Sequence, residues 1–156
     1  MTADPATWPR DDARVCDLLC ALPHWDWEFR HFPRRETRAL ALRLAQAGAG
    51  LIVGGHAHVV QPLERIGDTL VAYGLGDFLG TAFARQPWPG RIGSVLAVDI
   101  GLDGNARGRM AAYRCHPFFR LRDGRRERLV PVATLDGALR TKVARRLATV
   151  LGDGVA

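Results

Sequence analysis

Two short apolar runs on either side of an amphipathic segment constrain the fold of this chain more than any other feature. The runs cover residues 16–22 and 51–53, and each has the length and composition of a buried strand. Between them Leu40 and Leu44 recur at helical spacing, and Gly48 supplies a stop signal for a helix. A strand, a helix and a strand in this order predict two parallel strands joined by a right-handed crossover.

The later segments predict antiparallel strands and a closing helix. A Gly67-Asp68 turn joins two apolar runs into a hairpin. Thr134 is the expected N-cap of the final helix, whose apolar stripe ends before Gly152. The strands expected from these patterns cover residues 63–66, 69–75, 94–100, 109–115 and 126–132. The predicted fold class is therefore α/β: a β-α-β unit, antiparallel strands and a C-terminal helix, with residues 1–14 as a loose lead-in or short helix.

Length and composition indicate one globular domain over residues 1–156. Apolar residues make up 47% of the chain and charged residues 24%, which is unlike a disordered protein. No apolar run approaches the roughly 20 residues needed to span a bilayer, and the N-terminus lacks a signal-peptide pattern, so we expect a cytoplasmic chain as given. The three cysteines form no CxxC pair, and we expect reduced, mostly buried thiols.

The net charge of +6 raises the question of a nucleic-acid partner. Arginines concentrate in residues 120–128 and 140–146. Such runs can bind phosphate, but no aromatic residues interleave with them to stack on bases. A solvated, arginine-rich face is therefore the favoured interpretation.

Three histidines follow the two predicted parallel strands. His56 and His58 come two residues apart after residues 51–53, and His24 follows the neighbouring strand. In extended backbone, residues two apart point to the same side, and Gly54 and Gly55 allow a sharp turn and a close approach to a ligand. Because α/β folds place their sites at the carboxyl ends of strands, we expect the three imidazoles to converge on a metal site. A His-x-His pair by itself is weak evidence, and the third histidine strengthens it.

Three blocks of the sequence resemble a known family. The blocks "DLLCALPHWDWEF", "RALALRLAQAGAGLIVGGHAHVVQPLE" and "TLVAYGLGDFL" are similar in order and spacing to CapA-type capsule or poly-gamma-glutamate synthesis proteins. These belong to the calcineurin-like metallophosphoesterase superfamily. The resemblance covers about residues 15–100. It implies part of an α/β/β/α sandwich, corresponding to the C-terminal half of such a domain, with a dinuclear centre of Mn, Zn or Fe at the strand ends.

The resemblance also implies roles for individual residues. His24 and His56 would hold one metal, and His58 would hold the other. Two such ions can activate a bridging hydroxide and stabilise charge developing on a phosphoryl group. Glu28 aligns with the glutamate that follows the histidine-tryptophan pair in the resembling family. It would orient a histidine or act as an acid or base. The alternative is that Glu28 is a solvated loop carboxylate.

Departures from the family pattern qualify this expectation. The family's aspartate-x-histidine, bridging-aspartate and glycine-asparagine motifs do not precede His24. A three-histidine set suits one zinc with an open position better than two metals, and the site could be mononuclear or empty. Asp26 replaces a family glycine and is a candidate surrogate carboxylate in the catalytic set. Asp77, in the block "TLVAYGLGDFL", stands where the resembling family has the asparagine of a Gly-Asn-Phe sequence.

Three functions follow from these observations. The first is metal-dependent hydrolysis or transfer of a phosphoester or surface-polymer precursor, weak or absent until an N-terminal half completes the site. The second is a non-catalytic assembly subunit, and the third, least favoured, is an arginine-rich nucleic-acid binder. Because half a sandwich leaves an apolar sheet face uncovered, we also expect a homo-oligomer or a partner chain.

Overall fold

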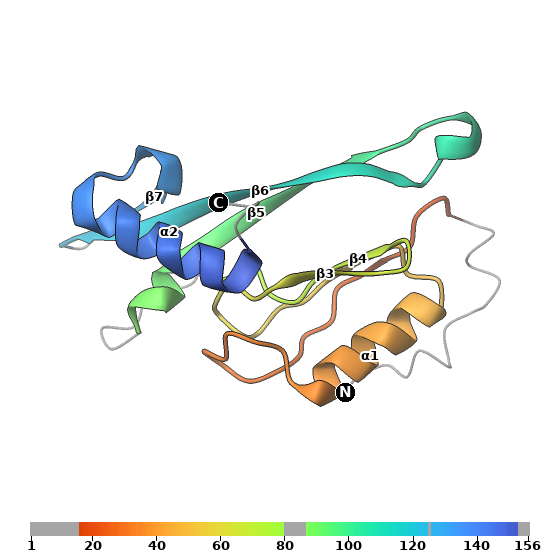
Figure 1. The fold of residues 1–156 in the computed structure, drawn as a ribbon, viewed down its shortest axis with the longest axis horizontal. Coiled ribbons are helices and arrows are strands. Elements are labelled where there is room, and N and C mark those ends of the chain that lie inside the picture. Colours follow the sequence, from red (N-terminus) through yellow and green to blue (C-terminus); the bar gives the residue numbers. More distant parts are fainter. Residues whose placement is uncertain (1–15, 80–86, 125, 153–156) are drawn as a thin grey trace.

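The computed structural model describes residues 16–79, 87–124 and 126–152, where two β-sheets and two α-helices form a mixed α/β fold (Figure 1). The α/β fold class is thus confirmed. A first sheet, defined as β1–β4, lies between α1 and a second sheet, defined as β5–β7 (Figure 1). The strands are β1 (Cys20–Ala21), β2 (Leu51–Val53), β3 (Leu63–Ile66), β4 (Thr69–Ala72), β5 (Ile92–Ile100), β6 (Met110–Asp123) and β7 (Arg126–Pro131). The lead-in over residues 1–14 lies outside the described residues.

The first sheet has the strand order β1-β2-β4-β3. The predicted parallel pairing of β1 with β2 is confirmed, and β4 pairs with β2 in parallel on the other side. The predicted hairpin of β3 and β4 is also confirmed. The predicted strand over residues 16–22 shortens to Cys20–Ala21, because its partner β2 is three residues long and offers no longer ladder. Three parallel strands therefore end at one edge of the sheet.

Helix α1 (Arg35–Gln46) covers one face of the first sheet. Its buried side chains include Ala41 and Leu44, which pack with Ile52 and Val71 of the sheet in one apolar cluster. The chain leaves the helix through Gly48, whose φ of +100° is in the region that glycine adopts without strain. The predicted helix and its stop signal are therefore confirmed.

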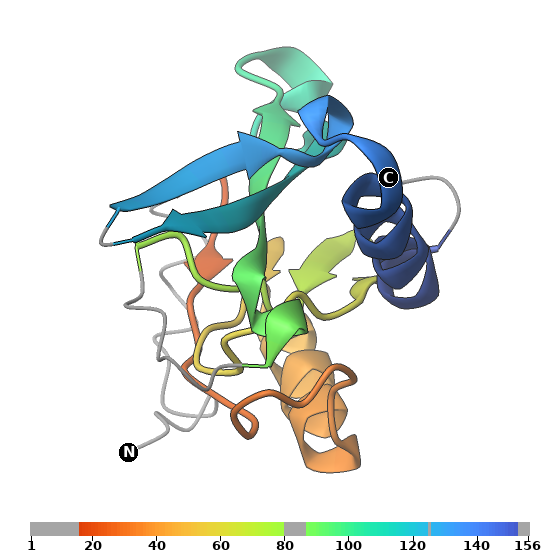
Figure 2. The ribbon, with the colours of Figure 1, turned by 90° about the vertical axis from the view of Figure 1, so that its left-hand side faces the viewer.

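The second sheet is antiparallel, with β6 between β5 and β7 (Figure 2). The strand predicted over residues 109–115 is too short, since β6 continues to Asp123 and pairs with β7 along residues 118–123. Pro117 lies within β6 but just outside the part that pairs with β7, where a missing N–H is tolerated.

Helix α2 (Gly137–Leu151) packs beside the second sheet (Figure 2). Its buried Val143, Leu147 and Val150 join the second apolar cluster together with Phe119 of β6. The expected N-cap, Thr134, is wrong. Thr134 ends a short 3-10 turn, where its hydroxyl donates to the Pro131 carbonyl at 2.9 Å, and Asp136 occupies the N-cap.

Two further expectations about burial are corrected. Cys16 and Cys20 are exposed, because the strand expected to bury them is short, and Cys115 is half-buried. Arg120, expected on a solvated arginine face, is 2% exposed because it lies in the long central strand β6. Among the described helices, neither has the length and apolar character required to cross a membrane.

Candidate metal centre

Three loops meet at the edge where the parallel strands of the first sheet end. The first follows β1 and carries His24 and Glu28, the second follows β2 and carries His56 and His58, and the third follows β4 and carries Asp77. Because β1, β2 and β4 run in parallel, their carboxyl ends bring all three loops to the same edge.

Backbone hydrogen bonds join the first loop to the second. The N–H of Gly55 donates to the Pro23 carbonyl at 2.9 Å, and the Trp25 N–H donates to the Gly55 carbonyl at 3.3 Å. Further along, the Phe29 N–H donates to the Ala57 carbonyl at 2.7 Å. These bonds extend the β1–β2 pairing beyond the regular strands, so the loops are held as an ordered layer rather than as independent segments.

The third loop is joined to the second in the same way. The Gln61 N–H donates to the Gly74 carbonyl at 2.9 Å, and Val60 and Leu75 form an antiparallel bridge. The Leu75 carbonyl in turn accepts from the N–H of Ser94 in the second sheet at 2.8 Å. The loop after β4 is therefore fixed to both sheets.

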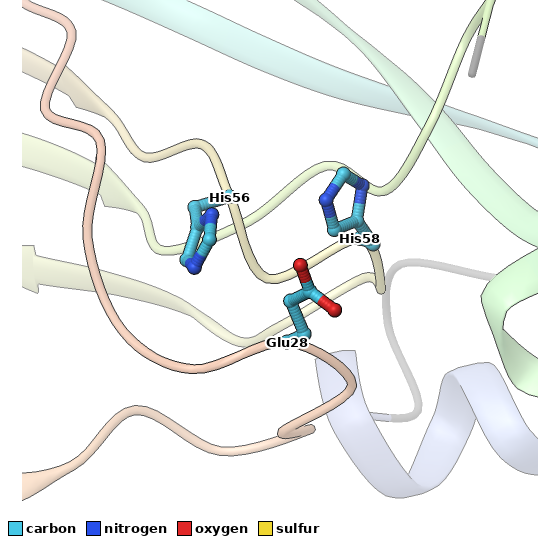
Figure 3. Close-up of side chains that lie close together, drawn as sticks. All are labelled: Glu28, His56 and His58. Atoms are coloured by element: carbon cyan, nitrogen blue, oxygen red, sulfur yellow. The ribbon is translucent and has the colours of Figure 1, made fainter.

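Glu28, His56 and His58 form a group whose ligand atoms all lie within 4.8 Å of one another. Figure 3 shows the Glu28 carboxylate rising from the first loop toward the space between the two imidazoles. Glu28 is exposed and both histidines are half-buried, so the group is reachable from solvent. Ligands about 2.1 Å from one tetrahedral ion lie about 3.4 Å apart, so small side-chain movements would complete a three-ligand site.

His24 lies beside this group without belonging to it. Its ring centroid is 4.4 Å from that of His56, and the His56 and His58 centroids are 5.9 Å apart. The structure therefore brings all three predicted histidines to one locus, and a carboxylate, Glu28, joins His56 and His58 more closely than His24 does. The remaining histidines, His31 and His116, lie outside the group.

Backbone strain gathers around the same locus. Among the described residues, the non-glycine residues with positive φ are Asp26, Phe29, His56 and His58, with values from 56° to 88°. Such conformations cost of order 1–3 kcal/mol each and persist where surrounding structure enforces them. Strain confined to the two loops that carry the group favours a functional interpretation of this edge.

Asp26 belongs to the first loop, where its carboxylate is a hydrogen-bond acceptor. Its Oδ1 accepts from the Trp27 N–H at 2.9 Å and from Arg34 Nε at 3.0 Å. Its Oδ2 accepts from the Arg34 N–H and from Gln61 Nε2, both at 3.3 Å. With its side chain fully buried and these four bonds in place, the carboxylate shapes the loop and lies outside the ligand group.

Gly54 has a packing role that the sequence did not reveal. A Cβ there would lie 2.0 Å from Trp25 Nε1 and 2.2 Å from the Tyr73 carbonyl oxygen. The indole N–H donates to that carbonyl at 2.8 Å in the core. The close approach expected of this glycine is therefore to the Trp25 indole, whereas a Cβ at Gly55 would meet no atom closer than 3.9 Å.

Asp77 is the residue of this edge whose place the sequence interpretation missed. Its Oδ1 lies 2.6 Å from His58 Nδ1, and its Oδ2 lies 3.9 Å from a guanidinium nitrogen of Arg120. The signal was available: Asp77 follows a strand that runs parallel to β2. The sequence pattern indicates only the hairpin pairing of this strand with β3, whereas its parallel pairing with β2 brings its carboxyl end to the site.

His31 also belongs to the first loop, and it lines a small cavity together with Arg146 and Leu147 of α2. Burial, and then the charge of Arg146, lower the pKa of His31 below its ordinary value of 6.5. Both causes favour the neutral imidazole in the folded chain. His116 lies on β6 and is exposed.

Comparison with known proteins shows that this edge is similar to a family of bacterial proteins. Residues 10–82 match the family described as "Bacterial capsule synthesis protein PGA_cap", a range that includes every residue from His24 to Asp77. The sequence is 36% identical over 93 residues to the PGA biosynthesis protein CapA of Bacillus subtilis (strain 168), covering 60% of this chain and 23% of that protein. It is also 36% identical over 63 residues to the capsule biosynthesis protein CapA of Bacillus anthracis, covering 40% of this chain and 15% of that protein.

The chain thus spans less than a quarter of the length of these curated relatives. The match to the family ends at residue 82, before the second sheet begins. All three residues of the ligand group lie within the matched range. Residues 10–82 are therefore similar to the CapA-type bacterial capsule synthesis proteins, and the chain resembles a fragment of such a protein.

Proposed function

We propose that this chain carries a single-metal site of Glu28, His56 and His58 that serves phosphoester hydrolysis or transfer in capsule synthesis. The observation that supports the proposal is the convergence of these three ligand atoms at the carboxyl edge of three parallel strands. Two imidazoles and one carboxylate form a donor set that suits zinc and also manganese or iron. A divalent ion bound there would supply a Lewis acid and lower the pKa of a bound water.

The chain's own residues would bind and orient the reacting groups. Glu28 and the two histidines leave the group open to solvent, which is the arrangement of a catalytic rather than a closed structural site. His24, beside His56, is placed to contact a ligand or to hold the His56 ring. A second ion of the kind found in the superfamily would need carboxylate ligands beyond this group, and we propose that these come from a partner segment or chain.

The alternative function is a non-catalytic assembly role. It is favoured by large apolar side chains that are exposed on the second sheet and its turns: Val95, Ile100, Leu102 and Leu129. A chain of this kind would fold and bind its partner with or without a metal. Metal dependence of activity therefore separates the two roles.

The metal proposal is tested by equilibrium dialysis of the purified chain against Zn²⁺ or Mn²⁺, followed by elemental analysis. We expect about one ion per wild-type chain and a marked loss in the His56→Ala/His58→Ala double variant and in Glu28→Gln. His116→Ala removes an exposed histidine from another sheet and is the matched control. Equal metal content in the wild type and the double variant would contradict the proposal.

The catalytic part is tested with bis(p-nitrophenyl) phosphate as a generic diester. We expect slow, metal-dependent hydrolysis that a chelator abolishes and that the double variant lacks. Hydrolysis that persists in the double variant would show that the activity has another source. Metal binding without any hydrolysis would favour the assembly role.

A further inference from the structure

We propose that Asp77 positions His58 as a metal ligand and that the buried Arg120 holds Asp77 in place. We name the His58–Asp77–Arg120 series the carboxylate relay. The inference rests on the proposed metal site and adds two positioning residues to it. One of them, Arg120, comes from the second sheet, outside the residues that match the capsule synthesis family.

The first contact of the carboxylate relay fixes which imidazole nitrogen can bind a metal. His58 Nδ1 lies 2.6 Å from Asp77 Oδ1. An ionised carboxylate can only accept a hydrogen bond, so Nδ1 carries the proton and Nε2 keeps its lone pair. In Figure 3 the His58 ring presents one nitrogen to the side that faces His56 and Glu28. The carboxylate thus selects the tautomer whose free nitrogen serves the ligand group.

The second contact of the relay restrains the carboxylate itself. Asp77 Oδ2 lies 3.9 Å from Arg120 Nη1, and the side chains of Asp77 and Arg120 are 15% and 2% exposed. A guanidinium stays charged when buried, and it needs an anionic neighbour there. Because one carboxylate oxygen faces His58 and the other faces Arg120, rotation of the carboxylate would disturb both contacts.

The backbone before Asp77 is also fixed. Gly76 has a φ of +73°, and a Cβ at this position would lie 2.5 Å from the Ile92 carbonyl oxygen. The turn therefore requires glycine and presses the third loop against β5. The aim of the Asp77 side chain is set by the same close contact between the two sheets.

The negative charge at position 77 is what the contact with Arg120 depends on. An asparagine amide oxygen could still accept a bond from His58 Nδ1 but would bring no charge to Arg120. Aspartate at 77 and a buried arginine at 120 therefore form a matched pair. The tautomer of His58 and the ionic contact can be tested separately.

The test compares the wild type with Asp77→Ala and Asp77→Asn by two measurements. Zn²⁺ affinity is measured by competition with a chromophoric chelator, and the His58 tautomer is read from ¹⁵N–¹H correlation spectra of the metal-free protein. We expect Asp77→Ala to weaken Zn²⁺ binding about 10- to 100-fold and to lose the uniform Nδ1–H tautomer. Asp77→Asn should keep the Nδ1–H tautomer and lose less Zn²⁺ affinity than Asp77→Ala. A purely structural role of Asp77 would not predict that the tautomer and the affinity change together.

Asp99→Ala is the control, since it removes an exposed carboxylate paired with Arg114 on the second sheet. If Asp77→Ala does not fold, Asp77→Asn and the wild-type tautomer still decide the question. The inference is overturned by wild-type affinity in both Asp77 variants, or by an Nε2–H tautomer of His58 in the wild type. A wild type that binds no Zn²⁺ but shows the Nδ1–H tautomer would reject the proposed metal function and leave the His58–Asp77 contact supported.

Discussion

Replacing Gly54 with alanine should destabilise the fold by inserting a methyl group into a buried hydrogen bond. The new Cβ would lie 2.0 Å from Trp25 Nε1 and 2.2 Å from the Tyr73 carbonyl oxygen. Both distances are far inside van der Waals contact, and both partners belong to the core: Trp25 is 6% exposed and Tyr73 is 0% exposed. The indole must therefore move, and its 2.8 Å bond to the carbonyl must lengthen or break.

The expected loss follows from two contributions. Overpacking of a well-filled core costs about 1–3 kcal/mol. Leaving the buried carbonyl without its donor costs about 1–3 kcal/mol more. Because displacement of the Trp25 indole relieves part of the clash while it breaks the bond, the two contributions overlap, and we expect a loss of about 2–4 kcal/mol in the free energy of unfolding.

Urea denaturation followed by tryptophan fluorescence measures this loss. Gly55→Ala is the matched control, because a Cβ at the next residue would meet nothing closer than 3.9 Å. We expect that control to stay within about 1 kcal/mol of the wild type, which is the range of a compatible glycine-to-alanine change. Equal stability of Gly54→Ala and Gly55→Ala would refute the packing argument.

Three further predictions concern other parts of the fold. Asp26→Ala removes a buried carboxylate that accepts from the Trp27 N–H, Arg34 and Gln61, and it should cost about 3 kcal/mol in urea denaturation. Asp26→Asn should cost less, and no loss would contradict the role of Asp26 in shaping the loop. Because the folded state lowers the pKa of His31, the unfolded chain binds its proton more readily, so stability should fall as pH drops from 7 through 6.5, and His31→Gln should flatten that slope. Exposed Cys20 should react with a thiol reagent in the native state faster than Cys115, whose pKa is raised by burial; mass spectrometry of labelled peptides would show a reversed order if this is wrong.

Local patterns were enough to predict the β-α-β unit and the helices. The spacing of Leu40 and Leu44 and the stop at Gly48 identified α1, because an amphipathic helix carries its period in the sequence. The limits of β6 and the burial of Arg120 could not be predicted in this way. They depend on pairing with β7 and on the approach of the other sheet, which are long-range contacts that a local pattern does not encode.

The candidate site also combines features that local patterns predict with features that depend on long-range contacts. The convergence of His24, His56 and His58 could be predicted, since residues that follow adjacent parallel strands meet at one edge. The contact between His58 and Asp77 could not, because it requires knowing that β4 lies parallel to β2. The positive φ angles that aim the His56 and His58 rings are likewise set by the loop contacts around them.

The central claim is that Glu28, His56 and His58 bind one divalent ion. Zinc-edge anomalous diffraction from crystals of the full chain soaked in Zn²⁺ tests it most directly. The account predicts a single strong peak about 2.0–2.2 Å from a Glu28 oxygen, a His56 nitrogen and His58 Nε2. Zinc bound elsewhere, or no peak among these three side chains at a concentration that saturates the protein in solution, would contradict it.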